Sequence, residues 1–133
     1  MGLLSGQVAV ITGGGRGIGR AIAERYARDG ATIVVSSRTA SDLDEVATQA
    51  RSQGSDGIAV VADAMSRDDA RRPVIEALAR FGRVDVLVNN AGGQFRAPIK
   101  KISPRGFEAV VRNNLIGGYI FMREVYARWM VSK

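Results

Sequence analysis

The 133-residue sequence contains neither cysteine nor histidine. Without cysteine it cannot form a disulfide, a thiolate metal site or a cysteine nucleophile. Without histidine it lacks the commonest metal ligand and the usual general base, so we expect no metal site, and acid–base chemistry must use Tyr, Lys, Asp or Glu. The apolar run at residues 8–11 is too short for a signal peptide or a membrane span. This predicts a cytoplasmic protein without a membrane partner.

Negative charge is the scarcer sign: 13 Asp and Glu stand against 19 Lys and Arg, a net charge of +6. This excess favours anionic partners such as nucleic acid, phosphorylated cofactors or coenzyme A esters. However, the arginines are spread from Arg16 to Arg128, and no aromatic residues interleave with them as on a nucleic-acid platform. We therefore expect a small-molecule substrate and no nucleic-acid partner.

Short apolar runs alternate with segments of helical period. Each run is continuous and apolar, as in strands buried on both faces. The predicted strands are residues 8–11, 32–35, 58–62 and 84–88. Helices are predicted between them: one ends near Arg28, the second is capped by Ser41 or Asp42, and the third is capped by Ser66. The alternation predicts βαβ units, right-handed crossovers and a parallel sheet.

The last helix is predicted from Ser103 to about residue 131, with Pro104 at a helix-starting position. Its apolar residues should form one stripe facing the core: Phe107, Val110, Val111, Leu115, Gly118, Phe121, Met122, Val125 and Trp129. Asn114, seven positions after Phe107, falls on this stripe. We therefore expect the Asn114 side chain to face the core and to need hydrogen-bond partners there.

A glycine-rich segment, Thr12-Gly13-Gly14-Gly15-Arg16-Gly17-Ile18-Gly19, follows the first strand and opens the first helix. This is the position of a dinucleotide-binding loop, in which glycine permits a turn with φ > 0, close approach to pyrophosphate and packing of helix on strand. The helix N-terminus adds amide donors for the phosphates. Thr12, Gly13, Gly15, Arg16, Gly17, Ile18 and Gly19 are therefore candidate cofactor-binding residues.

The spacing Thr-Gly-x-x-x-Gly-x-Gly resembles that of the short-chain dehydrogenase/reductase family. Asn89-Asn90-Ala91-Gly92 is similar to the family's Asn-Asn-Ala-Gly motif, and Asn114-Leu115-x-Gly117 to the motif around its catalytic asparagine. The resemblance covers nearly the whole chain. It implies an α/β fold in which residues 1–133 form the N-terminal portion of a Rossmann-type doubly wound parallel sheet. Four strands in the order 3-2-1-4, with flanking helices, would make up this incomplete sheet, leaving the apolar run at 84–88 on an edge.

The resemblance also implies roles for single residues. Asp63, followed by Ala64, stands where the family places an acidic residue against the adenine amine. Asn90, Ala91 and Gly92 would border the cofactor, and the backbone carbonyl of Asn114 would hold a water molecule of the proton relay. Structural alternatives exist, since Asp63 could end a strand, and Asn89 and Asn90 could be turn residues that tolerate the left-handed conformation.

The end of the second strand indicates which nicotinamide cofactor binds. An acidic residue there accepts hydrogen bonds from the adenosine ribose and repels a 2′-phosphate. This chain has Ser36-Ser37-Arg38 instead. Arg38 can pair with a 2′-phosphate, Arg16 can add a second cation, and Ser37 lies beside them. The sequence therefore favours NADP(H) over NAD(H); otherwise, both arginines are solvated surface residues.

The residues that carry proton transfer in this family, a Tyr-x-x-x-Lys pair and a serine, are missing from their expected context. Tyr119 is followed by Arg123 at i+4, and Tyr126 by Met130. We expect the chain to be the front half of a longer enzyme and to be inactive alone. The alternative is a catalytically inactive nucleotide-binding fragment.

The residues after the Asn-Asn-Ala-Gly motif are Gly93-Gln94-Phe95, and Val125-Tyr126-x-x-Trp129-Met130 follow later. Together they resemble the peroxisomal trans-2-enoyl-CoA reductase branch and its bacterial relatives. This implies hydride transfer to or from a carbonyl/alcohol or an enoyl-CoA substrate, so the substrate is an acyl-CoA ester or an alcohol or carbonyl compound. The full-length enzyme is expected to be a homo-oligomer.

Overall fold

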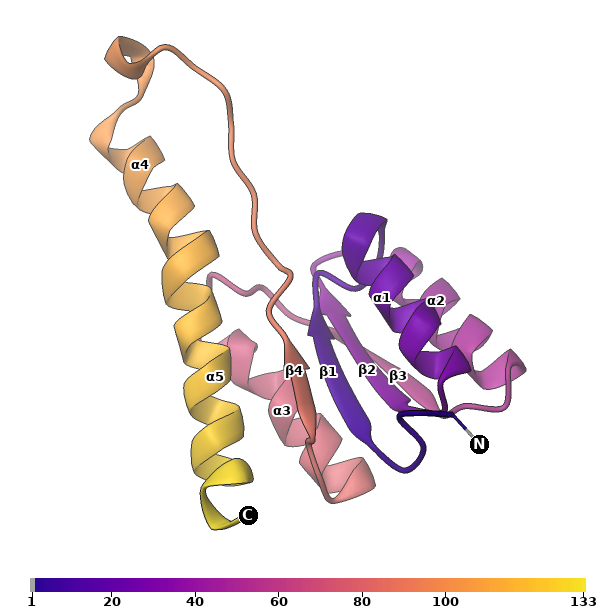
Figure 1. The fold of residues 1–133 in the computed structure, drawn as a ribbon. Coiled ribbons are helices and arrows are strands. Elements are labelled where there is room, and N and C mark those ends of the chain that lie inside the picture. The colour runs from indigo at the N-terminus through magenta and orange to yellow at the C-terminus, as the bar shows by residue number, and fades with distance from the viewer. Residues whose placement is uncertain (1) are drawn as a thin grey trace.

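The computed structural model describes residues 2–133, in which four parallel strands form the middle layer of the fold (Figure 1). Their bounds are β1 Val8–Thr12, β2 Thr32–Ser37, β3 Gly57–Val61 and β4 Val86–Val88. The spatial order is β3-β2-β1-β4, and all three strand pairs are parallel. This confirms the predicted sheet and its strand order.

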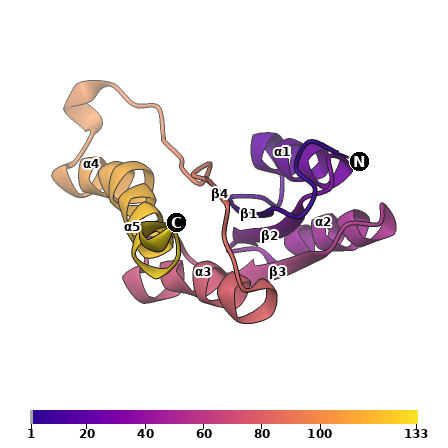
Figure 2. The same ribbon diagram turned by 60° about the horizontal axis from the view of Figure 1, so that its bottom comes forward.

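Two pairs of helices cover the two faces of the sheet. Figures 1 and 2 show α1 (Gly17–Arg28) and α2 (Ala40–Ser52) on one face, and α3 (Arg67–Phe81) and α5 (Gly117–Arg128) on the other. Every residue of β1 is buried, as its continuous apolar sequence requires. Each fully buried Val, Leu or Ile side chain contributes roughly 1.5–3 kcal/mol relative to exposure.

Strand β4 is shorter than its apolar sequence suggested. Val84 is buried but precedes the strand, and the three strand residues are only half-buried. The start of β4 is held to β1 by Asp85, whose backbone N–H donates to the Val8 carbonyl over 2.9 Å and whose Oδ2 accepts from the Val8 N–H over 2.8 Å. The described part of the sheet therefore has β4 as an edge strand fixed at one end by a side chain.

Helix capping follows the sequence at α3 but not at α2. The Ser66 hydroxyl accepts from the Asp69 N–H over 3.4 Å, as predicted. The predicted caps Ser41 and Asp42 are wrong, because α2 already begins at Ala40, after Thr39, and has no side-chain cap bond. The Ser37 hydroxyl accepts from the Thr39 N–H over 3.2 Å, so the chain turns from strand to helix earlier than the capping pattern indicated.

The predicted helix from Ser103 consists of α4 (Pro104–Val111), a π-helical turn (Arg112–Ile116) and α5, and a short 3₁₀ helix (Met130–Ser132) follows. Another 3₁₀ helix (Ile99–Lys101) precedes it. Ser103 caps α4, since its hydroxyl accepts from the Gly106 N–H over 3.0 Å. In the π turn the Gly117 N–H bonds to the Arg112 carbonyl, five residues back. The insertion of one residue rotates the following helix face by about 100° relative to the preceding one.

The single apolar stripe predicted for this helix is therefore wrong. Phe121 and Val125 are buried against the sheet, but the Phe107 and Leu115 side chains are 63% and 68% exposed, and Met122 is 54% exposed. Helix α4 extends beyond the end of the sheet (Figure 1), so no described layer covers its apolar residues. Asn114 is also exposed rather than directed into the core.

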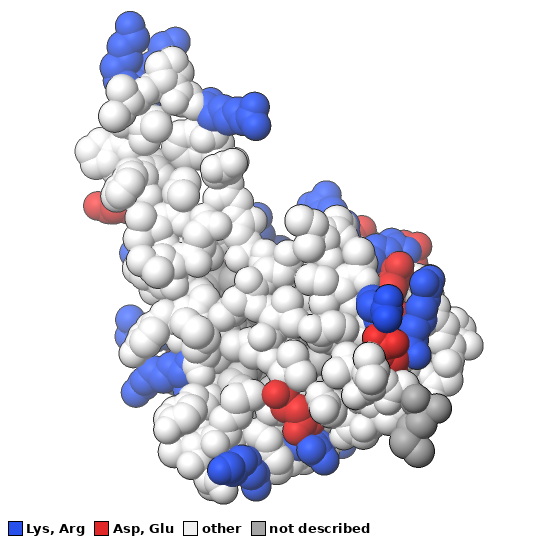
Figure 3. Space-filling model, in the orientation of Figure 1, with Lys and Arg blue, Asp and Glu red and all other residues white. Residues whose placement is uncertain are grey.

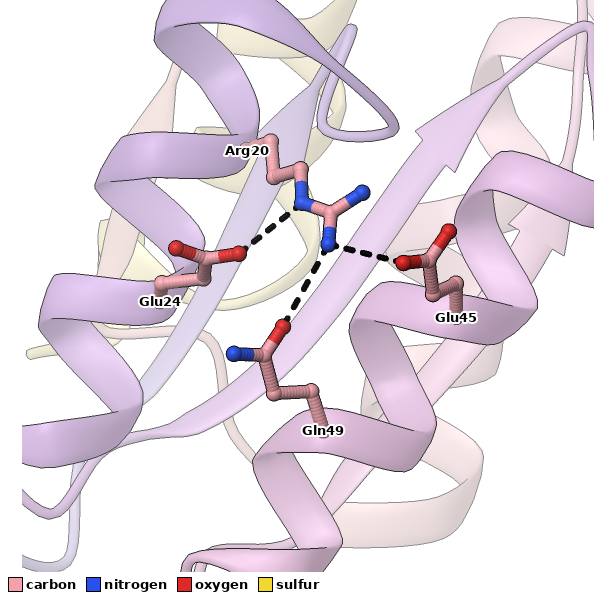
Figure 4. A network of polar contacts seen from close by, with 4 residues as sticks. All are labelled: Arg20, Glu24, Glu45 and Gln49. Atoms are coloured by element: carbon pink, nitrogen blue, oxygen red, sulfur yellow. Dashed lines mark hydrogen bonds and ion pairs between the residues drawn. The ribbon is translucent and has the colours of Figure 1, made fainter.

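A polar network fixes α1 against α2 (Figure 4). Arg20 on α1 donates to Glu24 Oε1 over 2.8 Å, to Glu45 Oε1 of α2 over 3.0 Å and to Gln49 Oε1 over 3.5 Å. The hydrogen bond to Arg20 lowers the pKa of the Glu45 carboxyl, and the same contacts raise the pKa of Arg20. The network holds the helix that follows the glycine loop against the middle of α2.

Candidate dinucleotide-binding site

A cavity of about 400 Å³ lies at the carboxyl ends of the four strands. Parallel α/β sheets bind ligands at this edge, where connections leave neighbouring strands in opposite directions. The cavity brings together predicted residues from every strand end: Thr12, Gly13, Gly15, Arg16, Ile18, Ser37, Arg38, Asp63, Ala64, Asn90, Ala91 and Gly92. The predicted residues Gly17, Gly19 and Asn114 do not line it.

The glycine loop follows β1, and several of its glycines lie against their surroundings without room for a side chain. Gly13 has a φ of +63°, in the left-handed region where glycine carries no steric cost. A Cβ on Gly15 would lie 2.9 Å from the Asp42 Cβ, and one on Gly19 would collide with the Gly13 carbonyl. Gly19 is thus a packing residue beneath the loop.

The N-terminus of α1 begins directly after the loop. Its first turn contains no acidic residue, and no side chain caps it. The first amide groups of a helix are unpaired within it and carry the positive end of its dipole. Together with the adjoining cavity, this terminus can accept an anionic group such as a pyrophosphate.

Thr12 locks the end of β4 onto the glycine loop. Its side chain is 2% exposed, and its Oγ1 accepts from the N–H groups of Asn90 (3.1 Å) and Ala91 (2.9 Å). The same hydroxyl lies 3.3 Å from the Val88 carbonyl, to which it donates. Asn90 Nδ2 donates in return to the carbonyls of Thr12 and Gly13, both at 3.1 Å. These contacts fix the floor of the cavity.

The Asn89 and Asn90 backbones exclude one alternative suggested by the sequence. No described residue other than glycine has a positive φ, so neither asparagine is a left-handed turn residue. Asn90 instead uses its side-chain amide to hold the loop, while Asn89 Nδ2 donates to the Gly118 carbonyl over 3.2 Å. Both therefore connect β4 to other elements.

Asp63 lies two residues after the end of β3 and is half-buried at the cavity wall. Its Oδ1 accepts from the Met65 N–H over 2.9 Å, and its own N–H donates to Asp69 Oδ2 over 3.2 Å. The residue thus shapes the turn into α3 and also borders the cavity, so its two sequence interpretations are compatible. The carbonyl of Ala64 lies 2.9 Å from where a Cβ on Gly117 would be, which places the start of α5 against this turn.

Two arginines and one carboxylate form the end of the cavity between the glycine loop and α2. Arg38 is exposed and forms no ion pair with any residue in the described range 2–133. The side chain of Arg16 is 83% exposed, and its Nε lies 3.8 Å from Oδ2 of Asp42, whose side chain is 35% exposed. This end of the cavity therefore carries a net positive charge.

Asn114 lies in the π turn, where hydrogen bonds hold its side chain. Nδ2 donates to the carbonyls of Gly93 (2.7 Å) and Val110 (2.9 Å), and Oδ1 accepts from the Gly93 N–H over 3.2 Å. These bonds attach the helix to the segment that follows Gly92. A π turn inside an α-helix is frequent at functional sites. Asn113, the neighbouring residue, lines the cavity instead.

Sequence reasoning missed several cavity residues: Ser36, Thr39, Asp42, Ala62, Met65, Asn113 and Phe121. Most adjoin residues that were predicted, so widening each motif by one position would have found them. Asp42 is different, because it lies in the first turn of α2. The only signal for it was that helices following parallel strands begin at the same edge of the sheet.

A family model described as "short chain dehydrogenase" matches residues 7–133. The chain therefore belongs to the short-chain dehydrogenase/reductase family. It is 38% identical over 117 residues to a peroxisomal 2,4-dienoyl-CoA reductase of Arabidopsis thaliana. The matched region covers 88% of this chain and 39% of that protein. The chain spans about half the length, or less, of the relatives it matches.

Solved structures share the fold over nearly the whole chain. The citronellol catabolism dehydrogenase AtuB of Pseudomonas aeruginosa PAO1 superposes with a TM-score of 0.90 at 38% identity, covering 97% of this chain and 53% of that one. A metagenomic short-chain oxidoreductase in complex with NADP has a TM-score of 0.89 at 37% identity, covering 97% and 58%. An NAD⁺-bound xylitol dehydrogenase has a TM-score of 0.90 at 29% identity, covering 98% and 50%.

No helix within residues 2–133 has the length and apolar character that a membrane span requires.

Proposed function

We propose that this chain is the cofactor-binding part of an NADP(H)-dependent short-chain dehydrogenase/reductase. The observation that carries the proposal is the pair of arginines, Arg16 and Arg38, on the cavity wall beside the end of β2. Neither Ser36 nor Ser37 supplies the carboxylate that would repel a 2′-phosphate. Arginine can contact phosphate through charge-assisted, bidentate hydrogen bonds.

The residues around the cavity suit the successive parts of a dinucleotide. The close-packed glycine loop and the uncapped N-terminus of α1 suit the pyrophosphate, and Asp63 and Ala64 suit the adenine. Asn90, Ala91 and Gly92 border the side toward β4. When bound, the nicotinamide supplies or accepts a hydride. The residues of this chain bind and orient the cofactor, and the Asn114 carbonyl in the π turn is our candidate for holding a relay water.

The two cofactor-bound neighbours show that relatives use either nucleotide. The metagenomic oxidoreductase holds NADP at 37% identity, and the xylitol dehydrogenase holds NAD⁺ at 29% identity. Family membership therefore does not decide the preference. The net positive charge at the end of the cavity between the glycine loop and α2, here called the ribose end, supports NADP(H).

The 133-residue chain alone should bind the cofactor without catalysing turnover. Neither Tyr119 nor Tyr126 has a lysine four residues later, and proton transfer needs a group that can exchange a proton at the substrate oxygen or carbon. The alternative, a nucleotide-binding protein without catalysis, also predicts binding without turnover. Extending the reading frame to look for a downstream Tyr-x-x-x-Lys distinguishes the two.

A basic segment leading away from β4 supports an anionic substrate. Between Asp85 and Glu108 the sequence has no acidic residue, but it carries four exposed cations: Arg96, Lys100, Lys101 and Arg105. Figure 3 shows Lys and Arg side chains gathered at this projecting end of the molecule. Phe95 and Phe107, which are 49% and 63% exposed, lie on the same segment. Cations beside apolar side chains favour an acyl-CoA ester over a small neutral alcohol as substrate.

Nucleotide affinity tests the cofactor assignment directly. Dissociation constants of NADPH and NADH for the chain are measured by fluorescence titration at fixed ionic strength. Arg38→Asp should lower NADPH affinity by roughly ten- to a hundredfold, because one charge-assisted contact contributes about 1.5–3 kcal/mol. NADH affinity should hold or improve. Arg80→Asp, on an exposed arginine of α3, is the matched charge control. An unchanged NADPH-to-NADH ratio in Arg38→Asp would refute the assignment.

A further inference from the structure

Asp42 is the one carboxylate on the cavity wall between the glycine loop and α2 in the described structure. The backbone fixes its place, because Gly15 has no side chain and the loop can approach α2 closely. A Cβ added to Gly15 would lie only 2.9 Å from the Asp42 Cβ. Arg16, the next residue of the loop, is thereby brought beside the carboxylate. Asp42 thus reaches the ribose end of the cavity from α2, not from the end of β2.

The Arg16–Asp42 contact is a loose ion pair. The Nε–Oδ2 separation is 3.8 Å, and no hydrogen bond joins the two side chains. With the guanidinium 83% exposed and the carboxylate 35% exposed, solvent screens the pair strongly. A ligand phosphate can therefore displace Asp42 from Arg16 without breaking a well-formed bond. The carboxylate then remains on the same wall as the bound phosphate.

We propose that Asp42 is a specificity-determining residue that lowers the preference of this cavity for NADP(H). The inference rests on the proposed function, since it concerns the same phosphate subsite. Asp42 competes with a 2′-phosphate for Arg16 and repels the phosphate by its own charge, while Arg38, which has no ion pair in residues 2–133, stays available to it. NAD(H) has no 2′-phosphate and is free of this competition. Specificity between two ligands depends on such repulsive elements as much as on attractive ones.

Removing the charge should therefore shift cofactor selectivity in a defined direction. Asp42→Asn should tighten NADPH binding about two- to tenfold, the range of one partly exposed charge pair, and leave NADH binding unchanged. The gain should shrink in 0.5 M salt, where the Debye length is about 4 Å. Both nucleotides are titrated against the 133-residue chain at low and high ionic strength. Thermal melting of each variant checks that the fold is as stable as in the native chain.

The matched control is Asp44→Asn. Asp44 lies on the same helix, is exposed, and does not line the cavity. Its substitution changes the net charge equally and should leave the NADPH-to-NADH ratio as it is in the native chain. Combining Asp42→Asn with Arg16→Gln tests the pairing: the gain from Asp42→Asn should be smaller when Arg16 is absent.

The outcomes separate the inference from the proposed function. Weaker NADPH binding in Asp42→Asn would show that Asp42 orients Arg16 toward the phosphate and would overturn the proposal. Weaker NADH binding would show that Asp42 accepts from the ribose, and an unchanged ratio would show that it is a solvated residue; either result also overturns it. If the native chain binds neither nucleotide, the proposed function itself fails.

Discussion

Replacing Thr12 with valine removes one hydroxyl from the end of β1 and keeps the shape of the side chain. That hydroxyl is bonded to the N–H groups of Asn90 and Ala91 and to the Val88 carbonyl, and it is buried. An unpaired buried polar group costs about 1–3 kcal/mol. Asn90 and Ala91 are half-buried, so water can partly replace the lost partner. We expect Thr12→Val to lower the free energy of unfolding by about 2–4 kcal/mol.

The control is Thr12→Ser, which keeps the hydroxyl and loses one methyl group, at a cost of about 0.8–1.5 kcal/mol. Equilibrium unfolding in urea gives both values, provided that the dependence on urea concentration is the same in each variant. Thr12→Val should also weaken NADPH binding, because Asn90, Ala91 and Gly92 border the cavity. Equal destabilisation by the two substitutions would refute the reasoning, since it would mean that the hydroxyl contributes nothing.

Three further predictions follow from single contacts. Gly15→Ala should weaken nucleotide binding at least tenfold, measured by titration, because its Cβ would force the loop away from Asp42. Burial would raise the pKa of Asp85, but the hydrogen bonds from Arg83 and the Val8 N–H together lower this pKa below its ordinary value. The free energy of unfolding should therefore fall as the pH drops below about 4, and less steeply in Asp85→Asn, as acid titration will show. Glu124→Gln should cost about 1–3 kcal/mol in urea unfolding, because buried Glu124 pairs with arginines of α3 and α5.

The sheet could be predicted from the sequence because its signals are local. A strand that is buried on both faces is apolar over most of its length, as at residues 8–11 of β1. The face that α2 buries is likewise recorded in the spacing of Leu43, Val46, Ala47 and Ala50, all of which are buried. The glycine loop was recognisable because close approach of backbone to backbone excludes any other residue at Gly19.

The last helix could not be predicted from periodicity, for two physical reasons. Periodicity assumes one residue per 100° along the whole helix, and the π turn Arg112–Ile116 breaks that count. It also assumes that every apolar stripe faces a second layer, but α4 runs past the end of the sheet. Phe107 and Leu115 therefore carry the pattern of core residues while being exposed. Asn114, between them in sequence, is exposed too, and its side chain bonds both to Val110 of α4 and to Gly93, 21 residues away.

The proposed cofactor preference depends on charges from three segments that are separate in sequence. Arg16 comes from the glycine loop, Arg38 from the residue after β2, and Asp42 from the first turn of α2. A prediction from the glycine loop and the end of β2 counts two cations and no anion. The folded chain places an anion 3.8 Å from one of those cations, so the positive charge available to a 2′-phosphate is smaller than the sequence motif indicates. On the proposed function, preference for NADP(H) is therefore a balance over the whole cavity wall, which a single carboxylate on α2 would shift.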